Sequence, residues 1–152
     1  MNFDYLNPVS ESLLTHIKMQ ANKTLGQCID IYTTKNGFPN LENKKIAIIG
    51  VDEDRASVNN IGAGSDLNEI RKELYQLYPG NWPISVVDLG NISKGNSIED
   101  TYFALGELLT YLIKSKINKI KQLGQEKSLT KVFKSRWCTI KAIRNYHSIF
   151  YN

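Results

Sequence analysis

The sequence has little cysteine and no long hydrophobic run. Its longest clean apolar run is residues 46–49, which is far too short to span a bilayer. The N-terminus, Met1 to Tyr5, is polar and acidic, so we expect no signal peptide, a cytoplasmic protein and no membrane partner. Cys28 and Cys138 form no spacing pattern, which favours reduced thiols that are buried and structural rather than catalytic.

Histidine and glycine motifs are equally scarce. Histidine occurs only at positions 16 and 147, and neither has an Asp, His or Cys neighbour at metal-ligand spacing. A dinucleotide-binding fingerprint is absent, because Leu67 stands where a third glycine would follow Gly62 and Gly64. We therefore interpret this glycine pair as part of a loop that leads into a helix.

What the sequence does contain is typical of one globular domain, with charge divided unevenly along it. Of its 152 residues, 41% are hydrophobic and 22% charged, which is enough apolar material for a buried core. The net charge of +4 combines two opposite parts. Residues 1–114 carry a net −4, whereas residues 115–152 carry a net +8 with Glu126 as their one acid.

Helical and strand patterns alternate through the first part of the chain. A helix is predicted over 8–24, and Ile70, Leu74 and Leu77 repeat at the spacing of a second helix that starts near Asp66. A capping box at 97–100 opens a third helix, whose core-facing stripe is Leu105, Leu108, Leu109 and Leu112. We expect strands at 28–32, 45–51 and 84–89. The alternation over 45–114 predicts an α/β fold with a parallel sheet.

The alternation breaks after Ile117, where a third parallel strand is due. Residues 118–125 offer no buried run, and residues 126–145 are weakly helical and basic. The sequence therefore divides into an α/β portion, 1–117, and a basic C-terminal tail, 118–152, that is weakly helical or poorly ordered. Aromatics among the basic residues are also typical of nucleic-acid binding, although no recognised module accompanies them.

Carboxylates follow the most apolar strand. Asp52, Glu53 and Asp54 come at its carboxyl end, which is the edge where open α/β sheets bind ligands. Such carboxylates can hold Mg²⁺ or Mn²⁺. A solvated polar loop is the simpler interpretation of the same three residues.

The stretch from Ile48 to Gly64 resembles the opening of the ureohydrolase family, which includes arginase, agmatinase and formimidoylglutamase. The shared features are a strand ending in Gly-Val, an acidic turn and a loop rich in Asn and Gly. Residues 70–74 are similar to the family's helix containing Ile-Arg, and residues 87–92 to its second strand with an Asp-x-Gly-Asp turn. Asp52 replaces the usual proline, and Asn91 replaces an acidic residue.

Further segments extend the resemblance to about residues 1–117. Residues 95–102 look like the family's next loop and helix start. Residues 3–6 and 38–43 look most like the formimidoylglutamase-type subgroup. The resemblance implies an arginase-like, three-layer α/β/α fold, present here as its N-terminal part. It also implies a hydrolase chemistry in which two Mn²⁺ ions and a bridging hydroxide cleave non-peptide C–N bonds of linear amidines.

The metal-binding segments of that family are missing from the sequence. It contains no Asp-x-His, and no Asp follows Asp100. We therefore expect a truncated family member that has no catalytic or metal-ligating residue of its own, no manganese in this chain and no activity alone. The resemblance implies a substrate-proximal loop whose members are Asp52, Asp54, Arg55, Asn59 and Asn60.

Two other functions remain open. One is a non-enzymatic binding module whose basic tail contacts nucleic acid or an acidic partner. The other is a structural subunit that pairs with a separate chain carrying the metal motifs. An open edge of the sheet could join the chain to such a partner or to a second copy of itself.

Overall fold

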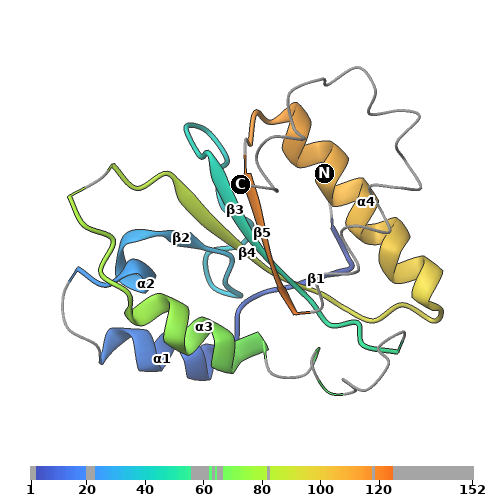
Figure 1. Cartoon of the computed structure of the whole chain (residues 1–152), viewed down its shortest axis with the longest axis horizontal. Coiled ribbons are helices and arrows are strands. Elements are labelled where there is room, and N and C mark those ends of the chain that lie inside the picture. Colours follow the sequence, from blue (N-terminus) through green and yellow to red (C-terminus); the bar gives the residue numbers. More distant parts are fainter. Residues whose placement is uncertain are drawn as a thin grey trace, which may run out of the picture.

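A mostly parallel sheet forms the centre of the protein (Figure 1). The computed structural model describes residues 3–19, 23–55, 62, 64, 67–81, 83–117 and 119–124. The strand β3 (Ile46–Val51) pairs in parallel with β4 (Val86–Ile92) on one side and with β5 (Lys119–Gly124) on the other. Beyond β4 lie β1 (Leu6–Asn7), which is antiparallel to it, and β2 (Asp30–Ile31), which is parallel. The predicted α/β class is confirmed.

Helices cover both faces of this sheet (Figure 1). On one face, α1 (Glu11–Lys18), α2 (Leu25–Cys28) and α3 (Leu67–Gln76) pack near Ile48 and Leu123. On the other face, α4 (Ile98–Lys114) packs against Ala47 and Ile49. Successive residues of β3 point to opposite faces, so its continuous apolar sequence supplies both cores.

Side-chain caps determine where two of the helices start. The predicted capping box is present, because Ser97 accepts from the backbone N–H of Asp100 and Asp100 accepts from that of Ser97. The predicted leucine stripe of α4 is buried. The first helix begins at Glu11 rather than at residue 8, because Ser10 caps it and accepts from the backbone N–H of Leu13.

The face of α3 differs from the one its apolar periodicity indicates. The buried residues are Leu67, Arg71 and Tyr75, whereas Ile70 is exposed, as is Leu77, which directly follows the helix. The spacing therefore predicted a helix correctly but misplaced the centre of its buried face, because Leu74 of the predicted stripe packs against the core whereas Ile70 does not. The physical reason is a buried ion pair between Arg71 and the sheet, described below.

The strand β5 corrects the prediction that no strand follows residue 117. It pairs with β3 along its whole length, from Lys119 to Gly124. In the described structure β5 has a strand partner on one side only. An edge strand of this kind does not require the continuous apolar sequence of a central strand, which is buried on both faces. Lys119 and Lys121 are exposed, while Gln122 and Leu123 are buried. The sheet thus extends to residue 124, and residues 125–152 lie outside the described part.

Two other expectations concern cysteine and membranes. Cys28 is an exposed free thiol, so its predicted burial is wrong. It ends a four-residue helix whose buried residue is Gly26, and Cys138 lies outside the described residues. Among the helices of the described residues, none has the length and apolar character needed to cross a membrane.

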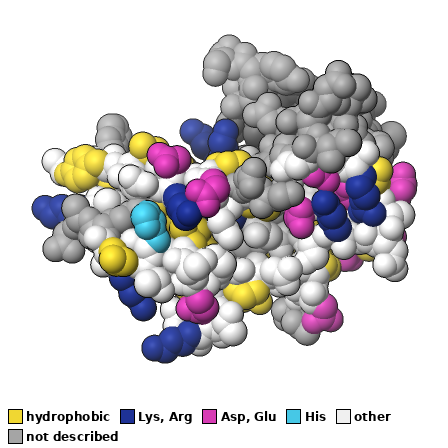
Figure 2. All heavy atoms as spheres, turned by 90° about the horizontal axis from the view of Figure 1, so that it is seen from below, with side chains coloured by type: hydrophobic (Ala, Val, Ile, Leu, Met, Phe, Trp, Pro, Cys, Tyr) yellow, Lys and Arg dark blue, Asp and Glu magenta, His cyan; other side chains and the backbone are white. Residues whose placement is uncertain are grey.

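The surface seen from below in Figure 2 mixes both signs of charge. Basic and acidic side chains lie next to each other across the described part of this face. We see no single-sign region on this view.

Candidate functional site

The chain leaves β3 and β4 toward opposite faces of the sheet. After β3 it runs to α3, and after β4 it runs to α4 on the other face. The two strands are neighbours and parallel, so their carboxyl ends form a topological switch point. In open α/β sheets, this is where the diverging loops leave a crevice for a ligand.

A small pocket of about 100 Å³ lies at this switch point. Polar side chains from both diverging loops and from β1 contribute to its wall. The lining residues are Asn7, Asp52, Gly64, Leu67, Asn68, Asn91 and Ser93. The backbone explains the presence of Asn7, because β1 places it directly opposite Asn91.

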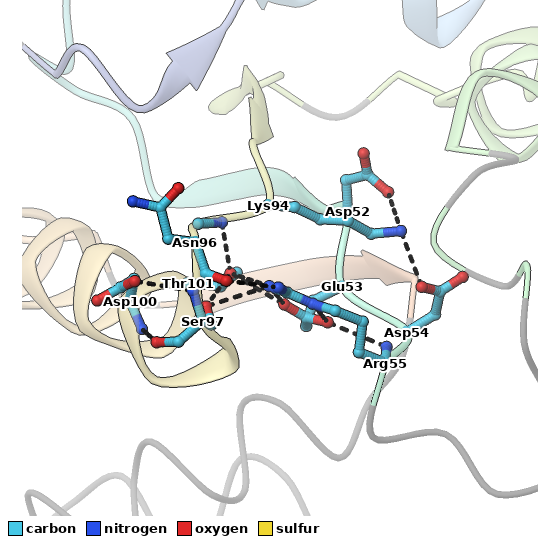
Figure 3. Close-up of polar contacts among 10 residues, drawn as sticks. Asp52, Glu53, Asp54, Arg55, Lys94, Asn96, Ser97, Asp100 and Thr101 are labelled. Atoms are coloured by element: carbon cyan, nitrogen blue, oxygen red, sulfur yellow. Dashed lines mark hydrogen bonds and ion pairs between the residues drawn. The ribbon is translucent and has the colours of Figure 1, made fainter.

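Among the three carboxylates that follow β3, Glu53 is fully buried and forms an ion pair with Arg55 (Figure 3). Arg55 Nη2 lies 2.6 Å from Glu53 Oε2, and Nε and the backbone N–H of Arg55 both donate to Oε1 at 3.0 Å. The Thr101 hydroxyl donates to Oε2 at 2.9 Å. The hydrogen bond from the Arg55 guanidinium is the main cause that holds the pKa of Glu53 below its usual value, against the opposing effect of burial.

Arg55 also fastens this loop to the start of α4. Its guanidinium donates to the backbone carbonyl oxygens of Asn96 and Ser97, at 3.2 and 3.1 Å (Figure 3). The resemblance implied a substrate-proximal role for Arg55. In the structure its guanidinium binds Glu53 and the two carbonyl groups, so that it links the loop after β3 to the loop after β4.

Asp54 is the second carboxylate, and it too has protein partners. Its side chain is 7% exposed, and Lys94 Nζ lies 2.8 Å from Oδ1. The backbone N–H of Gly62 donates to Oδ2 at 2.7 Å. The hydrogen bond from Lys94, followed by that from Gly62, lowers the pKa of Asp54.

Asp52 is the carboxylate that remains accessible. Its side chain is 43% exposed, and its closest cation is Lys94 Nζ, 3.6 Å from Oδ1. It lines the pocket, as does Asn68, whose buried Oδ1 has no hydrogen-bond partner among the described residues. Acceptors at both positions suit a ligand that brings N–H donors. The other two predicted loop residues, Asn59 and Asn60, lie outside the described residues.

Below the pocket lies a buried polar network that the sequence reasoning missed. The fully buried Arg71 donates to both carboxylate oxygens of Asp88 at 2.9 Å, in the two-pronged geometry that favours arginine. It also donates to Asn91 Oδ1 at 2.7 Å and to the Gly90 carbonyl oxygen at 2.9 Å. The Tyr75 hydroxyl donates to Asp88 at 2.7 Å. One signal was available: an aspartate inside an apolar strand, because a buried carboxylate needs a partner.

The described residues do not fit the two-manganese group that the family resemblance implies. They contain no group of three or more His, Cys, Asp or Glu residues arranged to hold a metal ion. Moreover, Glu53 and Asp54 already bind Arg55 and Lys94, whose positive charges oppose a divalent cation at the same oxygens.

Comparison with protein-family models, curated proteins and solved structures found no match for the chain.

The buried ion pair predicts a large stability difference between two adjacent substitutions. Arg71→Met leaves the Asp88 carboxylate buried without its cation and is expected to lower the free energy of unfolding by about 3–5 kcal/mol. Lys72→Met is the matched control, because Lys72 pairs with the exposed Glu69; it is expected to cost about 1 kcal/mol or less. Urea denaturation followed by circular dichroism measures both. Equal losses for the two variants would contradict the role of the pair.

The lowered pKa values of Glu53 and Asp54 predict a loss of stability in acid. The folded state holds these carboxylates ionised at a pH where the unfolded chain takes up protons. Their contribution is therefore complete above the ordinary carboxyl pKa of about 4 and is lost as the pH falls through the lower folded values. Glu53→Gln should flatten the fall of the urea midpoint between about pH 6 and pH 3. A slope identical to that of the wild type would show that Glu53 makes no such contribution.

Proposed function

We propose that the chain is the N-terminal part of a ureohydrolase-like, three-layer α/β/α unit that binds the amidinium or guanidinium group of a linear ligand. Binding takes place at the switch-point pocket, and the chain alone does not hydrolyse the ligand. An exposed free thiol at Cys28 is compatible with the reducing cytoplasm.

The observation that carries this proposal is that three consecutive acidic residues differ in whether a cationic side chain of the protein binds their carboxylates. Glu53 and Asp54 are bound by Arg55 and Lys94, whereas Asp52 keeps an accessible carboxylate at the pocket wall. A planar cation with several N–H donors forms a charge-assisted bond with such a carboxylate. It would also supply a donor to the unpartnered Oδ1 of Asn68.

The absence of hydrolysis follows from the chemistry that the family uses. Attack on an amidine carbon requires a hydroxide that two metal ions bind and activate. Two of the three carboxylates of the described loop, Glu53 and Asp54, are bound by cationic side chains, so we assign this part of the protein a binding role.

Association of the chain with a second copy of itself, or with a partner chain, also remains a proposal. In the described structure, β5 has a strand partner on one side only. Its outer edge is where we expect another strand to add. The nucleic-acid alternative depends on the basic tail, residues 118–152, most of which lies outside the described residues, and it stays a prediction.

Incubation with Mn²⁺ and candidate substrates tests the catalytic half of the proposal. Formiminoglutamate, arginine and agmatine are each expected to remain intact, as followed by chromatography of substrate and product. An arginase assayed in parallel with arginine shows that the conditions support turnover. Product formation by the purified chain, above a blank without protein, would contradict the proposal.

The role of Asp52 is tested by binding. Agmatine carries a guanidinium group, and Asp52→Asn keeps the shape of the side chain while removing its charge. We expect the substitution to weaken agmatine binding about tenfold or more, because a bond to a charged group is lost. Glu42→Gln is the control: it removes an exposed carboxylate from the loop before β3. Isothermal titration calorimetry compares the three proteins, and equal affinity for wild type and Asp52→Asn would overturn the assignment.

A further inference from the structure

The network beneath the pocket is built around an irregularity in β4. Ile48 of β3 pairs with Asp88 of β4, and Gly50 pairs with Asn91. The two pairs are therefore two residues apart in β3 but three residues apart in β4. The extra residue in β4 is a β-bulge. In a regular strand, residues 88 and 91 would point to opposite faces, whereas the bulge brings both to the α3 face.

Arg71 contacts each part of this bulge. Its guanidinium binds Asp88 before the bulge, the carbonyl oxygen of Gly90 within it, and Asn91 after it. Asp88 in turn accepts from the backbone N–H of Gly90 at 2.9 Å. The ion pair therefore satisfies the polar backbone groups that the bulge removes from the regular ladder.

The contact with Arg71 also determines which way the amide of Asn91 faces. A guanidinium only donates hydrogen bonds, so the group that faces it must be the carbonyl oxygen of Asn91. The NH₂ group then points away from Arg71. Asn91 lines the pocket, and its Nδ2 has no hydrogen-bond partner among the described residues.

Glycine at position 50 leaves the space in which this arrangement fits. A Cβ built on Gly50 would overlap Oδ1 of Asn91. The amide is thus held between the backbone of β3 and the guanidinium of Arg71, with little freedom to turn over.

We propose that Arg71 is a positioning residue, which holds Asn91 so that its NH₂ group donates to an oxygen atom of the bound ligand. This inference rests on the proposed function and extends it. The ligand carries an oxygen acceptor, such as a carboxylate, in addition to the cationic N–H group that Asp52 binds. Its chemical class is therefore a small zwitterion or an amidine with a polar oxygen, rather than a simple amine.

Arginine and agmatine separate these two contributions, because they differ only in the carboxylate. We expect the wild type to bind arginine more tightly than agmatine. Asn91→Ala should weaken arginine binding about tenfold and leave agmatine binding unchanged, because it removes one donor to a charged oxygen. Arg71→Lys should have the same selective effect, since lysine does not reproduce the planar fork. Lys72→Arg is the control for a neighbouring basic substitution.

A ligand-free measurement reports on positioning directly. In ¹H–¹⁵N spectra, the side-chain NH₂ signals of Asn91, assigned by their loss in Asn91→Ala, are expected to shift in Arg71→Lys and to remain in place in Lys72→Arg. If Arg71→Lys does not fold, Asn91→Ala still tests the ligand contact, because it leaves the ion pair between Arg71 and Asp88 in place. Circular dichroism establishes which variants are folded.

The outcomes separate the two claims. Equal loss of arginine and agmatine in Asn91→Ala, or no loss of either, overturns the role of Asn91 as a donor to a ligand oxygen. If the wild type binds neither ligand, the proposed function fails. The positioning claim is then decided by the Asn91 signals alone: a shift in Arg71→Lys supports it, and unchanged signals overturn it.

Discussion

The buried ion pair between Arg71 and Asp88 is the constraint on which the arrangement of α3, β4 and the pocket depends. Transfer of two charges from water into a protein interior is costly unless their hydrogen bonds are satisfied. Here the carboxylate also accepts from Tyr75 and Gly90, and the guanidinium also donates to Asn91 and the Gly90 carbonyl. Because these partners all lie on one helix face and one strand, the pair fixes how that helix sits on the sheet.

The consequences of this pair reach the surface. It turns α3 so that an arginine faces the core, while the apolar Ile70 is exposed. A second polar unit, the contact of Glu53 with Arg55 and Thr101, joins the loop after β3 to the start of α4. The first unit holds Asn91 and the second lies next to Asp52 in the chain, and both Asp52 and Asn91 line the pocket.

Features encoded by neighbouring residues were predictable from the sequence. The apolar run of β3 and the capping box at Ser97 depend on contacts within a few residues. The orientation of α3 could not be predicted in this way, because it depends on a contact between Arg71 and Asp88, which are 17 residues apart. The strand β5 was missed for a related reason: an edge strand with exposed lysines lacks the continuous apolar pattern of a central one.

The candidate site was predictable only in part. A cluster of acids after a buried strand pointed to the edge of the sheet where the pocket lies, but composition does not reveal which acid keeps its charge accessible. That depends on where Arg55 and Lys94 lie in space. The role of Arg55 in linking the two loops likewise depends on carbonyl groups more than 40 residues away, those of Asn96 and Ser97.

Chemical-shift mapping of the backbone amides during an arginine titration tests the central claim most directly. If the switch-point pocket binds the ligand, the largest shifts fall on Asp52, Asn68 and Asn91, which reach it from three different elements. Shifts confined to other parts of the chain, or none at saturating arginine, would contradict the account.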